Sequence, residues 1–248
     1  MSEVTQHIGI VAGSAEGAAL CYRTICFEAQ EFMGEHNHPE ITLNSIPMAQ
    51  HMPPIRANDW EGVAKLMADS AHKVAKAGAD FAICPDNTYH QAFKYLIPQS
   101  PIPWLHIAGA VAEEARRFGY GRLGILGTKY LTESDVYPEA LAEHKIEREI
   151  PDEPDRERIN DIIFKELVNG IFPETSRLYF NEVTEKLNWY KDIDHAALRE
   201  NLKYFLQEIS PDESTARINT SRWKNGIYFV TLQSEKTTTT QKIIVSNN

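Results

Sequence analysis

Cys84 is the strongest candidate for chemistry in this sequence, because it ends an apolar run, DFAIC (80–84), and polar, turn-forming residues follow it at once. A thiol that ends a strand and faces the start of a helix has backbone N–H groups and a helix dipole to stabilise its thiolate. Asn87 and Thr88 offer an amide and a hydroxyl that could hold a carboxylate. The alternative interpretation is a buried structural cysteine followed by an ordinary turn.

Two further apolar runs end in small polar residues. IGIVAGS (8–14) ends in Gly13-Ser14, and RLGILGT (122–128) ends in Gly127-Thr128. Strand–Gly–Ser/Thr turns are abundant, so neither is specific alone. Ligand sites of parallel α/β sheets lie at the carboxyl ends of the strands, so these turns and Cys84–Thr88 predict one binding edge.

Other arrangements are less suited to chemistry. Glu35, His36 and His38 could form part of a metal site, but neighbouring loop histidines are usually exposed and no further ligand cluster is evident, so we expect no metal. Cys21 and Cys26 lie five residues apart in a helical stretch and are expected to be packed core thiols. The sequence contains no GxGxxG, P-loop, HExxH or GxSxG motif, so nucleotide, zinc-protease and serine-hydrolase functions lack support.

The elements that must position these residues alternate along the first two-thirds of the chain. Apolar runs typical of strands occupy residues 8–14, 41–47, 80–84, 122–128 and 146–151. Residues at helical spacing occupy 15–32, 60–77, 108–118, 132–144 and 154–169. Strands separated by single helices predict a parallel sheet covered on both faces.

Composition limits the function classes. The 248 residues carry 25 Lys and Arg against 35 Asp and Glu, a formal charge of −10, which disfavours nucleic acid and anionic membranes as partners. Nowhere do 18 apolar residues follow one another, and the N-terminus has neither a basic start nor a long apolar segment typical of a signal peptide. Three cysteines are too few for a disulfide framework, so we expect a cytoplasmic protein.

After residue 187 the pattern changes. Leu198, Leu202, Phe205 and Leu206 indicate an amphipathic helix, and the segments GIYFVTLQ and TTTTQKIIVS are typical of a β-hairpin or the end of a small antiparallel sandwich. A parallel α/β domain rarely finishes in this way, so we expect a boundary between residues 188 and 215.

Five segments in this order closely resemble the aspartate/glutamate racemase family. They are IGIVAGS, ADFAICPDNTYH, IPWLHI, GYGRLGILGTKYLTESDVY and FKELVNGIFPETSRLYFNEVTEKL, and the resemblance covers about residues 7–187. It implies two similar α/β lobes, no cofactor, a small amino-acid or dicarboxylate substrate and a homodimer. It also implies an active site between the lobes, where one cysteine from each lobe removes or returns the α-proton, an arrangement that inversion of a carbon centre requires.

The resemblance implies roles for individual residues. Cys84 matches the catalytic cysteine of the first lobe, and Asn87 and Thr88 match the carboxylate-binding Asn-Thr pair, although Pro85 and Asp86 intervene where many members have fewer residues. His90 corresponds to a histidine often found after that pair. The remaining substrate-binding candidates are Ser14 in the first loop, Thr128 in the second-lobe Gly-Thr turn, and Arg56 as a carboxylate partner.

Two features depart from the family. No cysteine follows Cys84, so the second catalytic thiol is missing, and NWYKDIDHAAL stands where its strand is expected. The segment INTSRWKNGIYFVTLQSEKTTTTQKIIVSNN resembles the C-terminal sorting module of proteins secreted by the type IX system. The simplest account is a racemase fold whose C-terminal quarter has been exchanged.

We therefore expect an α/β protein of two Rossmann-like lobes with parallel sheets, the second incomplete, and a short antiparallel β-rich tail. The expected divisions are 1–105 (first lobe), 106–187 (second lobe), 188–215 (helical linker) and 216–248 (β-rich segment). The expected function is a cofactor-independent amino-acid racemase, impaired by the missing thiol. The alternatives are a one-cysteine decarboxylase or isomerase of a small diacid, and an inactive carboxylate-binding relic or fusion.

Overall fold

The computed structural model describes residues 6–187, 226–233 and 238–245. The chain divides into two compact units, Met1–Leu187 and Asn188–Asn248, which are described separately. In the part of the chain that the structure describes, no helix is both long enough and apolar enough to cross a membrane.

The first lobe is built on a parallel sheet of three strands in the order β2-β1-β3. These strands are β1 (Ile8–Ala12), β2 (Ile41–Ser45) and β3 (Phe81–Ile83). In the register, Ile8 of β1 pairs with Ile41 on one side and with Phe81 on the other. The central strand β1 is almost fully buried, as expected of a parallel strand covered on both faces.

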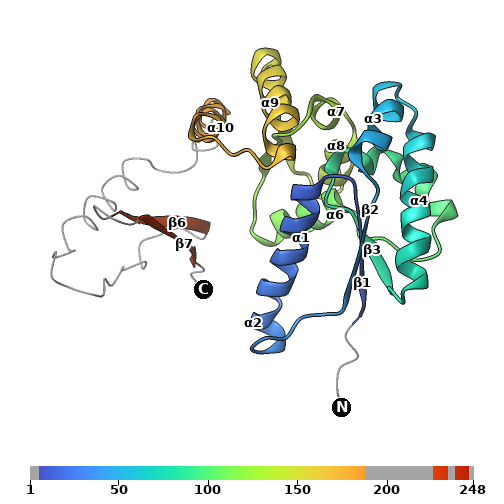
Figure 1. Cartoon of the computed structure of the whole chain (residues 1–248). Coiled ribbons are helices and arrows are strands. Elements are labelled where there is room, and N and C mark those ends of the chain that lie inside the picture. Colours follow the sequence, from blue (N-terminus) through green and yellow to red (C-terminus); the bar gives the residue numbers. More distant parts are fainter. Residues whose placement is uncertain (1–5, 188–225, 234–237, 246–248) are drawn as a thin grey trace. The chain divides into compact units, whose positions relative to one another are not determined.

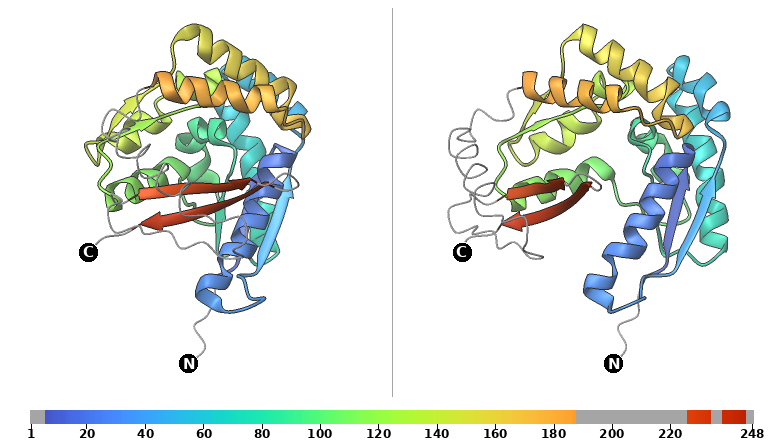
Figure 2. Two further views of the ribbon diagram at one scale, coloured as in Figure 1. Left: turned by 90° about the vertical axis from the view of Figure 1, so that its left-hand side faces the viewer. Right: turned by 60° about the vertical axis from the view of Figure 1, so that its left-hand side comes forward.

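Helices cover both faces of this sheet. Helix α1 (Ala15–Glu28) packs on one face and α4 (Trp60–Lys76) on the other, as Figure 1 and the right-hand view of Figure 2 show. Helix α4 begins where the Asp59 side chain accepts a hydrogen bond from Gly62 N, and it ends before Gly78, whose φ of 104° favours glycine. Two shorter helices of this lobe are α2 (Gln30–Met33) and α3 (Met48–Arg56).

The segment after β3 packs mainly on α4 of the first lobe before the chain enters the second lobe. It forms the 3-10 helix η1 (Asn87–Ala92), α5 (Phe93–Leu96) and a short turn η2 (Ile97–Gln99). Beyond it, Trp104 bridges to Ala82 in the parallel direction. The turn after Cys84 therefore belongs to the first lobe, and η1 also contacts two helices of the second lobe.

The second lobe has a parallel pair of strands, β4 (Arg122–Gly124) and β5 (Glu147–Glu149). Its helices are α6 (Ile107–Arg117), α7 (Lys129–Thr132), α8 (Val136–Ala142), α9 (Glu153–Lys165), the 3-10 turn η3 (Leu167–Asn169) and α10 (Glu174–Lys186). Helices α9 and α10 lie side by side in the views of Figures 1 and 2. A separate core of buried apolar side chains, which includes Ala112, Leu131 and Leu141, holds this lobe together.

In the C-terminal unit, β6 (Gly226–Gln233) and β7 (Thr238–Val245) pair in the antiparallel direction, with Gly226 opposite Val245. The amphipathic helix predicted around Leu198–Leu206 lies outside the described residues.

The predicted fold class is confirmed: two α/β lobes with parallel sheets, the second with few strands, and an antiparallel hairpin near the C-terminus. Some helix boundaries differ. The helix predicted over 132–144 begins only at Val136, because the preceding turn is closed by Ser134, whose hydroxyl donates to Leu131 O. The helix predicted over 154–169 ends at Lys165 and continues as the turn η3.

Candidate active site

Cys84 is buried at the end of β3, with 3% of its surface exposed. Its Sγ donates to the backbone oxygen of Asp86 at 3.7 Å. Burial raises the pKa of the Cys84 thiol well above its ordinary value, and the nearby Asp86 carboxylate raises it further. The sequence had suggested that helix N–H groups would stabilise a thiolate, but here desolvation outweighs any such effect, and Cys84 is a protonated thiol at neutral pH.

Asp86 joins the turn after β3 to the turn after β1. Its carboxylate accepts hydrogen bonds from Gly13 N at 2.8 Å and from the Ser14 hydroxyl at 2.5 Å, with Ser14 N at 3.4 Å. Burial raises the pKa of the Asp86 carboxyl, and the three hydrogen bonds oppose this shift. Ser14, at the N-cap position of α1, thus directs its hydroxyl to Asp86 and makes no side-chain capping bond to its own helix.

Asn87 and Thr88 reach across to the second lobe. The Tyr137 hydroxyl donates to Asn87 Oδ1 at 2.7 Å, and the Thr88 and Thr128 hydroxyl oxygens lie 2.9 Å apart. Thr128 also caps α7, because its hydroxyl oxygen accepts from Leu131 N at 3.3 Å. The structure therefore places three of the predicted site residues at the junction of the lobes, in two separate side-chain hydrogen bonds.

Tyr89 packs on the turn after β1. A Cβ atom at Gly13 would lie 2.1 Å from the Tyr89 hydroxyl oxygen, so glycine is required for this close approach. The Tyr89 ring stacks on His51, with ring centroids 4.4 Å apart. Both residues are buried, and within the described residues the Tyr89 hydroxyl and His51 Nδ1 have no hydrogen-bond partner. Burial lowers the pKa of His51 to about 4.

The His90 side chain is hydrogen-bonded to the backbone of Cys84. Its Nε2 donates to the backbone oxygen of Cys84 at 3.0 Å, and its ring stacks on Phe93 with centroids 4.2 Å apart. The ring of His106 meets His90 edge-on at 4.5 Å. Burial lowers the pKa of His90 to about 3, so the imidazole is neutral. His90 therefore holds the Cys84 backbone without adding a charge.

Arg56 is not part of this group. It is the last residue of α3, is exposed, and forms neither an ion pair nor a side-chain hydrogen bond with any residue from 6 to 187. Its role as a carboxylate partner stays a prediction.

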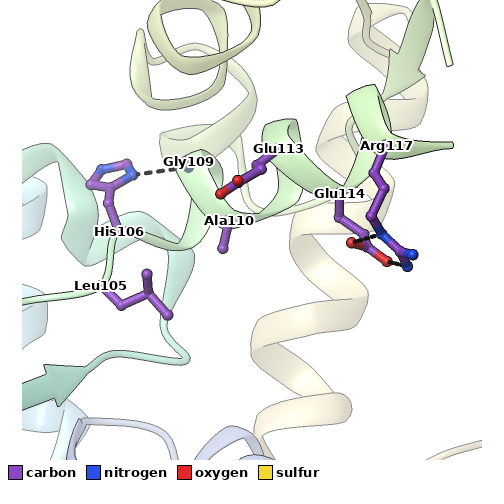
Figure 3. Close-up of a pocket in the computed structure, with 7 residues that line it drawn as sticks. All are labelled: Leu105, His106, Gly109, Ala110, Glu113, Glu114 and Arg117. Atoms are coloured by element: carbon purple, nitrogen blue, oxygen red, sulfur yellow. Dashed lines mark hydrogen bonds and ion pairs between the residues drawn. The ribbon is translucent and has the colours of Figure 1, made fainter. Parts of the chain in front are cut away.

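Two surface cavities flank the site. One, of about 380 Å³, has Ser14 in its wall together with side chains from α1, η3 and the turn after η3. The other runs along α6, and Figure 3 shows its polar side chains: His106, whose Nδ1 accepts from Gly109 N, and the Glu114–Arg117 ion pair. Over the described ranges, no group of three His, Cys, Asp or Glu side chains is arranged to hold a metal ion.

Sequence reasoning missed three members of the site: Asp86, Tyr89 and Tyr137. In the sequence, Asp86 is noticeable only as one of the two residues that lengthen the motif, although an acidic residue directly before Asn-Thr is itself a signal of a polar site. The contact of Tyr137 with Asn87 joins residues 50 apart, and no local pattern indicates it.

The C-terminal part of the chain matches a second family, the secretion system C-terminal sorting domain, over residues 203–246. This is the type IX sorting module that the tail was predicted to resemble. It overturns the expectation of a cytoplasmic protein, because such a domain directs export. That expectation depended on the cysteine count and the N-terminal composition, which indicate the location of a protein less directly than a sorting domain does.

The larger match is to the Asp/Glu/hydantoin racemase family, over residues 14–193. A protein from Yersinia pestis assigned as an Asp/Glu racemase is 31% identical, with a TM-score of 0.65 over 75% of this chain and 82% of that chain. An aspartate racemase homologue from Pyrococcus horikoshii OT3 is 30% identical, with a TM-score of 0.57 over 67% of this chain and 73% of that one. An aspartate racemase from Picrophilus torridus, at 16% identity and a TM-score of 0.59 over 73% and 75% of the two chains, shares the fold. This chain therefore belongs to the Asp/Glu/hydantoin racemase family.

Proposed function

We propose that the protein is a cofactor-independent enzyme of the amino-acid racemase type, in which Cys84 transfers the proton at the α-carbon of an amino acid. The observation that carries the proposal is the position of the buried Cys84 thiol at the end of β3, separated by two residues from Asn87 and Thr88, whose side chains are hydrogen-bonded to second-lobe residues. Membership of the racemase family supports the same reaction class.

The donors near Cys84 suit the charge that develops during the reaction. Removal of an α-proton moves negative charge onto the substrate carboxylate, so the site must offer hydrogen-bond donors there. Because Asn87 Oδ1 accepts from Tyr137, the amide Nδ2 of Asn87 is left to donate. The hydroxyls of Thr88 and Thr128 supply two further polar groups beside it.

The sequence has a thiol in the first lobe and none in the second, since its three cysteines are Cys21, Cys26 and Cys84. A thiolate at Cys84 takes the α-proton and becomes a thiol, and the same thiol returns a proton to the same face of the carbon. Proton transfer from one face exchanges the α-hydrogen with solvent and retains the configuration. Inversion requires a proton from an acid on the other face.

The high pKa of Cys84 sets the pH dependence of this reaction. The protonated thiol is inactive as a base, and the thiolate fraction rises about tenfold for each pH unit below the thiol pKa. Because burial raises this pKa, the exchange rate should keep rising between pH 7 and pH 9. A plateau below pH 8 would contradict Cys84 as the base.

The test is incubation of each enantiomer of a panel of amino acids in D2O with the full chain. Loss of the α-proton signal is followed by NMR, and configuration by chiral chromatography. We expect deuterium uptake with little inversion, abolished by Cys84→Ser and unchanged by Cys26→Ser, which removes a thiol of α1 instead. Neither uptake nor inversion with any amino acid would refute the proposal and favour an inactive carboxylate-binding relic.

A second candidate is decarboxylation or isomerisation of a small diacid. The observation that favours it is the burial of the Cys84 thiol, which raises its pKa and favours the protonated form, because loss of CO2 from a malonate leaves an enediolate that needs one proton from an acid. Release of CO2 from substituted malonates, or conversion of maleate, would distinguish it from α-proton exchange.

A further inference from the structure

The N-terminus of α1 is an anion-binding position that the chain fills with its own carboxylate. Two backbone N–H groups and a hydroxyl point at one place there: Gly13 N, Ser14 N and Ser14 Oγ. Such donors at the start of a helix bind carboxylates and phosphates. Asp86 accepts all three hydrogen bonds, so the donors are occupied before any substrate arrives.

The charge of Asp86 is not balanced by a cation. None of the ion pairs formed within residues 6–187 includes Asp86, and its partners are neutral N–H and O–H groups. A second carboxylate brought to this end of α1 would therefore find the donors taken and a like charge beside it. Glu16, in the first turn of α1, adds another acidic side chain at the same place.

The space next to Ser14 is apolar. The cavity of about 380 Å³ that Ser14 borders is walled mainly by aliphatic and aromatic side chains, namely Ala19, Leu20, Leu167, Val168 and Phe172. The cation in its wall is Arg23, which lies nine residues beyond Ser14, about 13 Å along the helix axis. The Arg23 guanidinium is directed along α1 to Phe27, 6.0 Å from the ring centroid.

We propose that Asp86 determines specificity, by excluding substrates that carry a second carboxylate, so that the site takes amino acids with a neutral, apolar side chain. The proposal rests on the function proposed above, because it names the substrate class of the same site. The α-carboxylate of such a substrate binds at Asn87, Thr88 and Thr128, and its side chain lies toward the cavity beside Ser14. Aspartate and glutamate carry a charge that this arrangement repels.

The test measures binding, which does not depend on turnover. Dissociation constants of the full chain for leucine, methionine, aspartate and glutamate are obtained by isothermal titration calorimetry at pH 7. We expect leucine or methionine to bind at least tenfold more tightly than either dicarboxylic amino acid. Equal or tighter binding of aspartate or glutamate, or no binding of any of the four, would overturn the proposal whether or not any variant folds.

Asp86→Asn removes the charge and leaves an amide oxygen that can still accept from Gly13 N, while the amide Nδ2 can donate to the Ser14 hydroxyl oxygen. We expect it to improve glutamate binding about tenfold and to leave leucine binding within a factor of two. The matched control is Asp69→Asn, the same change at an exposed position of α4, which should leave the ratio of the two constants unchanged. An unchanged ratio in Asp86→Asn would overturn the role of Asp86.

Arg23→Gln tests the competing explanation. If the wild-type chain binds glutamate more tightly than leucine and Arg23→Gln removes that preference, Arg23 receives the second carboxylate and the proposal is wrong. The proposed reaction at Cys84 and the proposed specificity set by Asp86 can be refuted independently of each other. Selective binding of leucine with no deuterium exchange would overturn the reaction alone. Exchange that is faster for glutamate than for leucine, together with tighter glutamate binding, overturns the specificity alone.

Discussion

His90 makes the folded chain sensitive to acid. The imidazole is buried and its pKa is lowered from 6.5 to about 3, so it is neutral in the folded state over most of the pH range. In the unfolded chain the same group takes a proton below about pH 6.5. A lowered folded pKa contributes stability that is complete above pH 6.5 and is lost progressively as the pH falls toward 3.

The size of the effect follows from the shift. At pH 4.5, two units below the pKa of 6.5 in the unfolded chain, His90 is protonated in the unfolded chain but still neutral in the folded one. Each of these pH units lowers the free energy of unfolding by about 1.36 kcal/mol, so the total loss is about 3 kcal/mol. His51, whose pKa is lowered to about 4, acts in the same direction and adds a similar amount. Together these losses approach the whole stability of a marginal domain.

The assay is urea unfolding at pH 7 and pH 4.5, followed by far-UV circular dichroism. Glutamine can reproduce the N–H that His90 donates to the Cys84 carbonyl but does not titrate, so His90→Gln should lose about 3 kcal/mol less than the wild-type chain between the two pH values. His72→Gln, at an exposed position of α4, serves as the control and should follow the wild type. Equal losses in His90→Gln and the wild type would refute the reasoning.

Three other predictions concern the two turns and the tail. Gly13→Ala should lower the free energy of unfolding by about 1–3 kcal/mol, because the new Cβ overlaps the Tyr89 hydroxyl. In a double-mutant cycle, Tyr89→Ala in the same chain should recover part of this loss. Tyr137→Phe should reduce α-proton exchange about tenfold, since Asn87 loses the donor that orients it, while the unfolding free energy falls by only about 1 kcal/mol, which leaves the chain folded. An exchange rate within about twofold of the wild type would contradict a positioning role. Removal of residues 203–246 should keep the protein inside the cell, as measured by fractionation of cells and medium in a host that carries the secretion system; unchanged export would contradict the sorting role.

The strand ends were predictable from the sequence because they depend on local patterns. The runs before Ser14, Cys84 and Thr128 are apolar, short and followed by small polar residues. The carboxyl ends of β1 and β3 meet at one edge of a sheet, but Thr128 follows β4 in a separate sheet, so the prediction of a single edge for all three turns is wrong. The structure places these three residues in such turns, with Thr128 bonded to Thr88 and Ser14 bonded to Asp86. The domain divisions and the roles of the site residues stay predictions.

What the sequence could not supply is the environment of each group. The thiol of Cys84 follows a strand and precedes a helical turn, which predicts a lowered pKa, yet burial and the charge of Asp86 raise it. The turn is a 3-10 helix of six residues, whose few aligned peptide dipoles cannot offset the desolvation. Asp86 meets Gly13 across 73 residues of sequence, so the partner that occupies the α1 N-terminus is visible only in three dimensions.

The hydrogen bonds that join the two lobes have a consequence for the conditions under which the protein works. Between the two lobes, within residues 6–187, the three side-chain hydrogen bonds join uncharged groups: Tyr137 to Asn87, Thr88 to Thr128, and Gln91 to the Tyr130 carbonyl. Salt screens charges but hardly affects neutral hydrogen bonds. The junction is therefore expected to hold at high as well as low ionic strength, which suits a protein that carries a sorting domain for export.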